Sequence, residues 1–542
     1  MNLQQLVNRG IFVSNLLKHS SIGQNCIVLL FIFVITFLRV DFNAVPFEDA
    51  AILMRYAENF AEGFGIVWNP GSLPVDGATD FLFVIITGFL KILTGAGIEP
   101  IVQFLNIYSH IVSIYIAYYT LRAVLKAPFV LSIITTLYLL LGPGAILITS
   151  KFATPFFVLL VTMLWLTTIM IIINTDKNKF IPLIFGALSL LVGLARPEGV
   201  FLSLFFLLSI ILARGVKSVS RLIIYYMMIM LILGGVYFVW RWQYFGYPFP
   251  NPYYRKMGSG FNIESLKMSV IFTFKFIFPF IPILMFAFIE KPRVKSLMAI
   301  SLPAVAFTLI FGMIDSSMNF MGRFQYVNMF IIGMSWWLPL RGLKVEEFLS
   351  EKFKSNVRVR NTLRFITLFC IIAVFVFQVK YNTVKVYADG RYDIGVILSS
   401  YQARGYKIAC SEAGLIPYYS KLTTLDTWGL NDQEIAHSGL ITDSILIKFD
   451  PDLIMFHAAF SPLIQPKVST DHQKMGILLK QFAERNDYSL IACFGVDPFV
   501  THYYYLKRGI LDFASINEQI KSLKYIWYEN GVICVNFSEN RL

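Results

Sequence analysis

Residues 41–80 read DFNAVPFEDAAILMRYAENFAEGFGIVWNPGSLPVDGATD and form the longest polar interruption in the first 120 residues of the chain. An acidic pair, Glu48 and Asp49, opens a pattern typical of a helix, and a segment rich in Gly, Asn and Pro closes the stretch. Strongly apolar sequence lies on both sides of it. We therefore expect a carboxylate-bearing loop between two membrane spans.

The overall composition indicates a polytopic α-helical membrane protein. Of 542 residues, 56% are hydrophobic and 15% are charged, and 51 are Phe, which is more apolar side-chain surface than a water-soluble core needs. The formal net charge is +13, and much of the excess lies between hydrophobic stretches, where the positive-inside rule places cytoplasmic loops. We therefore expect no nucleic acid as a partner. The basic runs are 122–126, 177–179, 214–221, 291–295 and 341–364.

Hydrophobic segments of about the length that a bilayer requires recur throughout residues 1–380. They fall near 26–39, 80–97, 101–121, 128–147, 153–174, 180–195, 200–213, 221–240, 268–289, 297–313, 325–340 and 363–379. The first follows Arg9 and Lys18 and lacks a small-residue cleavage site, so it is interpreted as a retained anchor. The basic loops place the C-terminus outside, which predicts about eleven transmembrane helices and one re-entrant segment near 141–155 or 195–213.

The composition changes after residue 380. Residues 381–542 alternate short apolar runs, such as DLIMFH and YSLIACFG, with polar stretches typical of helices. This pattern predicts a soluble α/β domain of ordinary size that follows a transmembrane module at 1–380. The five cysteines show no CxxC or other metal-ligand spacing, so no zinc site is predicted.

A helix that starts at Asp49 would have one apolar and one polar face. The apolar face holds Ile52, Leu53, Tyr56 and Phe60, and the polar face holds Glu48, Arg55, Asn59 and Glu62. Such a helix is expected to lie on the membrane surface with its polar side toward a cavity. The alternative interpretation is that Asp49 only caps the helix and Glu48 is solvated near its positive end.

Ionisable residues interrupt apolar sequence at three further places on the same side. Arg196 and Glu198 flank Pro197, and an ionisable residue at membrane depth costs about 2.5–3.5 kcal/mol or more unless it lines a cavity or meets a partner. The alternative interpretation is that Arg196 and Glu198 only contact each other where a helix ends at Pro197. The aromatic, basic loop 241–260 indicates either an anionic ligand or an interfacial belt. Arg323 lies at the start of a hydrophobic span. It is interpreted either as a site residue or as an anchor whose side chain reaches to the membrane surface.

Carboxylates, guanidinium groups and aromatic rings on one rim of a helical bundle suit glycosyl transfer from a lipid phosphate. The phosphate leaves without protonation if cations stabilise it, and one carboxylate suffices as general base for the acceptor hydroxyl. Adjacent Glu48 and Asp49 are poor candidates for the acid and base pair of a glycoside hydrolase. A transporter or flippase for a lipid-linked saccharide would use the same rim without chemistry, although the hydropathy pattern shows no related halves.

The stretch FEDAAILMRYAENFAEGFGIVWNPG…VDGATDF resembles the first outer loop of the GT-C superfamily of membrane glycosyltransferases. It is most similar to the branch that contains terminal arabinofuranosyltransferases, in which an acidic pair precedes RYA, VxNPG and V[ED]G. Matches continue in the same order along the chain. They are RPEG at 196–199, YFGYPFPNPYYRK at 244–256, GRF at 322–324 and SEAGLIPYYS…DTWGLND at 411–432. The resemblance implies a GT-C fold and a polyprenyl-phosphate sugar donor.

The resemblance also implies roles at the matching positions. An acidic residue of the first outer loop would be the base of an inverting transfer, with Asp49 the first candidate and Glu48, where the branch has Asp, the second. Candidates for binding the donor phosphate or lining the cavity are Arg55, Arg196, Tyr254, Arg255, Lys256 and Arg323. Further cavity or loop candidates are Asn59, Asn69, Asp76, Thr79, Glu198, Asn251 and Tyr253.

The branch implies a pentofuranose as one candidate sugar and a cell-envelope glycan or glycolipid as the acceptor. No cofactor follows from the sequence. Glu48 and Asp49 could hold a divalent ion together with the donor phosphate, although no ligand spacing in the sequence indicates such a site. The protein is expected in the inner (plasma) membrane of a bacterium, in contact with membrane lipid, with the active site and the C-terminal domain extracytoplasmic.

Overall fold

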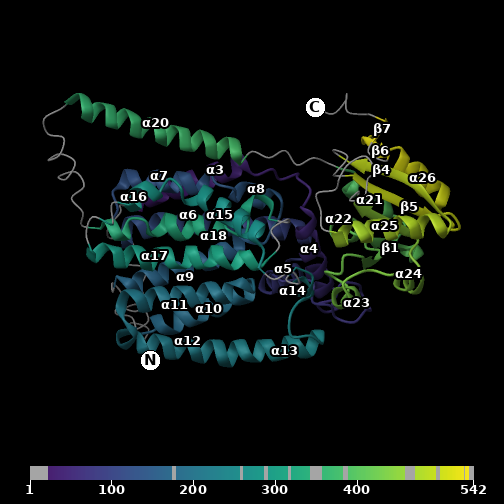
Figure 1. The fold of residues 1–542 in the computed structure, drawn as a ribbon, viewed down its shortest axis with the longest axis horizontal. Helices are drawn as coiled ribbons and strands as arrows, with labels where there is room; N and C mark the ends of the chain where they lie inside the picture. Colours follow the sequence, from purple (N-terminus) through teal and green to yellow (C-terminus); the bar gives the residue numbers. More distant parts are fainter. Residues whose placement is uncertain are drawn as a thin grey trace.

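The computed structural model describes residues 22–173, 179–256, 261–285, 288, 291–314, 319–341, 357–382, 389–457, 470–495, 501–529 and 532–535. Arg9, Lys18 and residues 342–356 of the basic run 341–364 lie outside these residues. A bundle of long helices is joined at one end to a smaller domain built around a β-sheet (Figure 1).

The bundle helices correspond to the apolar segments of the sequence, because a chain in lipid must satisfy its backbone polar groups within the helix. The first half contains α3 (Ile22–Arg39), α5 (Phe81–Thr94), α6 (Ile98–Tyr119) with the π-turn η1 (Thr120–Val124), α7 (Phe129–Leu140), α8 (Gly144–Thr149), α9 (Thr154–Ile172), α10 (Ile181–Ala195) and α11 (Glu198–Arg214). The second half contains η2 (Val216–Val219), α12 (Ser220–Ile229), η3 (Met230–Gly234), α13 (Gly235–Phe245), α14 (Asn251–Lys256), α15 (Ile263–Ile277), α16 (Ile281–Met285), α17 (Lys291–Ile310), η5 (Phe311–Met313), η6 (Phe320–Gly322), α18 (Tyr326–Ser335), η7 (Leu338–Leu340) and α20 (Val357–Tyr381).

Within the described residues, six helical stretches are long and apolar enough to cross a membrane, and shorter apolar helices accompany them. The chain is therefore an integral membrane protein. The number of about eleven crossings stays a prediction. Of the two suspected re-entrant segments, 141–155 contains the short helix α8, and 195–213 contains the break between α10 and α11.

The C-terminal domain is built on a seven-stranded mixed sheet of order β2-β1-β3-β5-β4-β6-β7. Parallel pairs join β1 to β2 and β3, and antiparallel pairs join the remaining neighbours. The strands are β1 (Lys407–Cys410), β2 (Thr423–Asp426), β3 (Leu453–His457), β4 (Tyr488–Gly495), β5 (Thr501–Lys507), β6 (Trp527–Glu529) and β7 (Val532–Val535). The helices are α21 (Arg391–Ser399), α22 (Leu415–Ser420), α23 (Gln433–Ser438), α24 (Asp443–Phe449), α25 (Thr470–Arg485) and α26 (Phe513–Lys521). The predicted α/β class is confirmed.

The helix at the start of the first loop, α4 (Glu48–Ala61), lies between the bundle and the C-terminal domain (Figure 1). It packs against α5 on one side and α22 on the other. The prediction that its polar side faces a cavity was wrong, whereas its position on the membrane surface stays a prediction. The C-terminal domain covers the helix, and Arg55 and Asn59 of the polar face are buried at 3% and 7% exposure.

Candidate active site between the bundle and the C-terminal domain

A cavity of about 980 Å³ lies beside the start of α4, between the break separating α10 from α11 and the turn before α18. Most of its wall is apolar, and α10, α11, η3, α13, η5 and the segment 248–253 all contribute to it. Polar side chains also line it, and five charged ones lie close together: Asp49, Asp80, Arg196, Glu198 and Arg323. The other polar lining residues are Thr79, Thr154, Tyr237, Arg241 and Tyr253. The cavity therefore offers a charged end for a polar group and an apolar wall for a long hydrocarbon chain.

Asp49 and Arg323 form an ion pair at the charged end. Nη2 of Arg323 donates to Oδ2 of Asp49 at 2.5 Å, and the guanidinium lies 4.3 Å from the ring centroid of Phe152. The preceding residue, Gly322, has φ +68, and a Cβ there would lie 2.5 Å from the ring of Phe272. Glycine is therefore required for the turn that brings Arg323 to the cavity. The Asp49 side chain is 28% exposed, so its carboxylate is accessible from the cavity.

A second guanidinium, Arg196, lies in the break between α10 and α11. Its Nε is 2.8 Å from Oε1 of Glu198 and 3.7 Å from Oδ1 of Asp80, and its guanidinium lies 5.2 Å from the ring of Phe324. The Arg196–Glu198 contact of the alternative interpretation exists, and both residues also line the cavity. The charged end thus holds two guanidinium groups and the three carboxylates paired with them.

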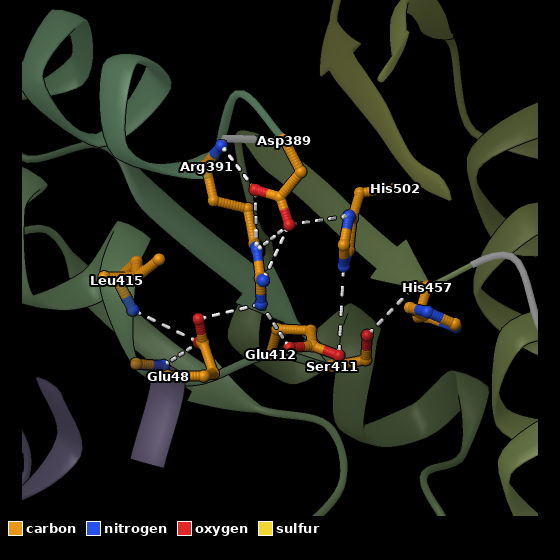
Figure 2. Close-up of polar contacts among 9 residues, drawn as sticks. Glu48, Asp389, Arg391, Ser411, Glu412, Leu415, His457 and His502 are labelled. Atoms are coloured by element: carbon orange, nitrogen blue, oxygen red, sulfur yellow. Dashed lines mark hydrogen bonds and ion pairs between the residues drawn. The ribbon is translucent and has the colours of Figure 1, made fainter. Parts of the chain in front are cut away.

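Glu48, although adjacent to Asp49, contacts the C-terminal domain instead of the cavity (Figure 2). Its Oε1 accepts hydrogen bonds from the backbone N–H groups of Gly414 and Leu415, and its Oε2 accepts one of 2.9 Å from Nη1 of Arg391. Burial raises the pKa of Glu48 to about 7, and Arg391 opposes the shift. Successive helical residues point about 100° apart, so the two carboxylates face different neighbours.

Arg55, Asn59 and Asn69 bind backbone groups of the first loop and the C-terminal domain. The Arg55 guanidinium donates to the carbonyl groups of Trp68, Pro417 and Leu422 and to Oδ1 of Asn69. Asn59 donates to the carbonyls of Val67 and Trp68, and Asn69 exchanges hydrogen bonds with the backbone of Thr424. These polar side chains attach the Gly- and Pro-rich loop to the sheet domain.

Asp76 and Arg241 form a buried bidentate pair, in which Nε and Nη2 of Arg241 each lie 2.7 Å from a carboxylate oxygen of Asp76. Burial raises the pKa of Asp76, whereas Arg241 lowers it. The backbone N–H of Asn251 donates to the carbonyl oxygen of Asp76 at 2.9 Å. Asp76 therefore connects the first loop to α13 through Arg241 and to the start of α14 through Asn251, and Tyr253 of α14 lines the cavity.

The remaining residues of the aromatic loop contact the C-terminal domain. The ring of Tyr254 lies 4.3 Å from that of His437, and the Arg255 guanidinium lies 4.2 Å from the ring of Trp428. Arg255 also donates to the carbonyl of Gly439. The side chain of Lys256 lies outside the described part of the chain.

The structure divides the predicted site residues into two groups. Those in the cavity wall are Asp49, Thr79, Arg196, Glu198, Tyr253 and Arg323. Those with contacts elsewhere are Glu48, Arg55, Asn59, Asn69, Asp76, Asn251, Tyr254 and Arg255. Sequence reasoning missed Asp80 and Phe152. Asp80 ends the polar stretch directly before an apolar helix, which was a usable signal, whereas nothing local distinguishes Phe152.

Comparison with known proteins identifies the fold. Residues 381–508 match a family described as a domain of unknown function (DUF8728), and a search of curated proteins finds no match. Among solved structures, ArnT from Cupriavidus metallidurans is 13% identical in the apo state, with a TM-score of 0.57 over 90% of this chain and 98% of that chain. The same protein has been solved bound to undecaprenyl phosphate, with a TM-score of 0.54 and 12% identity over the same shares of the two chains.

Two further structures share the arrangement. The oligosaccharyltransferase AglB from Archaeoglobus fulgidus, in complex with an inhibitory peptide and a dolichol-phosphate, has a TM-score of 0.54 and 10% identity over 90% of this chain and 75% of that chain. The arabinofuranosyltransferase AftD from Mycobacteria has a TM-score of 0.50 and 11% identity over 90% of this chain and 40% of that chain. The chain therefore has the GT-C fold.

Proposed function

We propose that the protein is a membrane glycosyltransferase that moves a sugar from a polyprenyl-phosphate donor to an acceptor hydroxyl with inversion. The observation that carries this proposal is the cavity itself, in which Asp49, Arg196 and Arg323 share one charged end and the rest of the wall is apolar. The comparisons support it, since ArnT was solved with undecaprenyl phosphate and AglB with a dolichol-phosphate.

The donor phosphate would bind to Arg323 and Arg196, with its polyprenyl chain along the apolar wall. Arginine suits this role because its planar guanidinium contacts phosphate through two parallel N–H groups. A phosphate on Arg323 would compete with Asp49 for the same N–H donors. Donor binding would thereby release the Asp49 carboxylate from its ion pair and direct it to the acceptor.

Asp49 would then take the proton of the acceptor hydroxyl as general base. The acceptor oxygen attacks the anomeric carbon from the side opposite the phosphate, and the bond between that carbon and the phosphate oxygen breaks. Polyprenyl phosphate leaves with the electron pair, and the guanidinium groups stabilise its added negative charge. A single displacement of this kind inverts the anomeric configuration.

Helix direction supports the predicted orientation. α11 starts at the cavity and spans about 25 Å at 1.5 Å per residue, so its basic end and the run at 214–221 lie at the far end of the bundle. The positive-inside rule puts that end in the cytoplasm. We infer a bacterial inner-membrane protein with its cavity and C-terminal domain extracytoplasmic. The donor sugar, with a pentofuranose as one candidate, would pass to a cell-envelope glycan or glycolipid.

The test uses purified protein in lipid nanodiscs and a panel of polyprenyl-phosphate pentofuranoses and hexoses, each with candidate acceptors. Release of polyprenyl phosphate and formation of glycosylated acceptor are followed together, and the anomeric configuration of the product is read by NMR. Asp49→Asn should lower turnover by about 10²–10⁴-fold, the usual contribution of a general base. Glu62→Gln changes an exposed carboxylate just after α4 and should retain activity.

Full turnover by a folded Asp49→Asn variant would refute the assigned base. Donor binding without release, unchanged by Asp49→Asn, would instead favour a transporter or flippase of a lipid-linked saccharide. That outcome is checked by following the movement of a fluorescent donor across proteoliposomes.

A further inference from the structure

A cluster of imidazole and carboxylate groups lies at one edge of the C-terminal sheet, apart from the cavity. Glu412 comes two residues after β1, His457 is the last residue of β3, and His502 is the second residue of β5. β1 and β3 are parallel, so their carboxyl ends meet at the same edge, where ligands of α/β sheets commonly bind. The antiparallel register pairs His457 with His502, and their ring centroids lie 5.1 Å apart.

We propose that Glu412, His457 and His502 bind a divalent metal ion of the zinc class. One potential ligand atom from each residue lies within 4.8 Å of the other two, and Nε2 of His502 is 3.9 Å from Oε1 of Glu412. Zinc binds nitrogen at about 2.0–2.1 Å and carboxylate oxygen at about 2.0–2.2 Å, so two ligands of one ion lie up to about 4 Å apart. Inward shifts of less than about 1 Å would complete the site.

The surroundings of His502 support a ligand role. The side chain is 1% exposed, yet within the described residues neither of its ring nitrogens has a hydrogen-bond partner. Nδ1 is 4.0 Å from Oδ2 of Asp389 (Figure 2). A histidine that binds metal through one nitrogen ordinarily donates its other N–H to a carboxylate, and this arrangement would give both nitrogens of His502 a partner.

Glu412 is oriented by a neighbour in the same way. Its Oε2 accepts a 2.5 Å hydrogen bond from Nη1 of Arg391, which leaves Oε1 on the side of His502 (Figure 2). The same guanidinium also binds Asp389 and Glu48. Three carboxylates thus share one guanidinium, and a divalent cation would balance the excess negative charge. Two imidazoles and one carboxylate favour zinc over magnesium or calcium, which prefer oxygen ligands.

This site would connect metal binding to the cavity without taking part in the chemistry. Arg391 joins Glu412 to Glu48, and Glu48 precedes Asp49 at the start of α4. A metal ion on Glu412 would therefore strengthen the contact between the C-terminal domain and the helix that carries Asp49. The proposal goes beyond the proposed glycosyltransferase function and does not rest on it, because metal content is measured independently of transfer.

The experiment uses the full-length protein in nanodiscs without a histidine tag. The protein is stripped with a chelator, supplied with zinc chloride and dialysed against metal-free buffer, and its metal content is then measured by mass spectrometry. Wild type should retain about one zinc per chain, and His502→Gln and His457→Gln should each lower the content at least tenfold. Asp389→Asn should weaken zinc affinity by about 10–100-fold, as loss of an outer carboxylate partner does.

His472 is the matched control, because its ring lies 5.8 Å from that of His457 but outside the proposed ligand set. His472→Gln should keep zinc, and an equal loss in that variant would overturn the ligand assignment. Melting temperature is the second readout: zinc should raise it for wild type and not for His502→Gln, while magnesium and calcium should leave it unchanged. A wild type that retains no zinc and shows no shift would overturn the proposal.

Discussion

Replacing Gly414 by alanine perturbs the contact between the C-terminal domain and the first residue of α4. A Cβ at position 414 would lie 2.0 Å from the carbonyl oxygen of Glu48 and 2.8 Å from its carboxyl carbon. Real Cβ contacts below 3.0 Å are essentially absent from proteins, so the two segments must separate by about 1 Å. The hydrogen bond from the Gly414 N–H to the Glu48 carboxylate would be distorted by the same movement.

The expected magnitude has a stability part and an activity part. Overpacking of this kind costs about 1–3 kcal/mol of unfolding free energy. Because Asp49 follows Glu48 directly, a 1 Å shift of the helix start displaces the proposed base, and a misplacement of that size can lower a rate by about 10²-fold. Gly414→Ala should therefore reduce turnover much more than it reduces the amount of folded protein.

The assay measures release of polyprenyl phosphate and melting temperature on the same nanodisc preparations. Gly509→Ala is the matched control in the same domain, because a Cβ there has nothing within 4 Å and the residue does not have a positive φ. That variant should behave as wild type. Unchanged turnover and melting temperature for Gly414→Ala would refute the reasoning that this contact positions Asp49.

Three further outcomes are expected. Arg323→Met removes a proposed phosphate contact, and steady-state kinetics should show a donor KM raised by about 10–150-fold. That factor corresponds to the loss of one hydrogen bond to a charged group. Asp76→Asn leaves Arg241 buried without its carboxylate and should lower the free energy of unfolding by about 3–5 kcal/mol. The double variant Asp76→Asn, Arg241→Met leaves no unpaired charge and should lose less stability. Thermal unfolding measures both. The pKa of Glu48 is raised from 4.5 to about 7 in the folded protein, so the unfolded chain releases this proton more readily. The free energy of unfolding should therefore fall as the pH rises from about 4.5 to about 7. Glu48→Gln should flatten this part of a plot of melting temperature against pH.

The fold was largely predictable because its signals are local. The apolar segment expected at 153–174 is α9, from Thr154 to Ile172, and the run DLIMFH contains β3. An apolar stretch of span length has few alternatives to a helix in lipid, and alternation of apolar and polar runs defines strands and helices in the C-terminal domain. The sheet order was not predictable in this way, because it depends on pairings between distant strands.

The candidate site was predictable only in part. Asp49, Arg196 and Arg323 were identified as ionisable residues beside apolar sequence, where a partner or cavity is required. The ion pair of Asp49 with Arg323 joins residues 274 positions apart, and no local pattern specifies it. The imidazole pair His457 and His502 was missed, since it arises from the register between β3 and β5 and not from ligand spacing along the chain.

The amino-acid sequence by itself determined which segments form long apolar helices, which part forms an α/β domain and which charged residues require a partner, because these depend on side-chain transfer free energies and short-range periodicity. Only the tertiary structure decided which partner each charge meets. Glu48 and Asp49 are neighbours in the chain, yet one binds Arg391 of the C-terminal domain and the other Arg323 of the bundle. The reason is physical: the helix turns about 100° between them, and what lies on each side is set by elements hundreds of residues away.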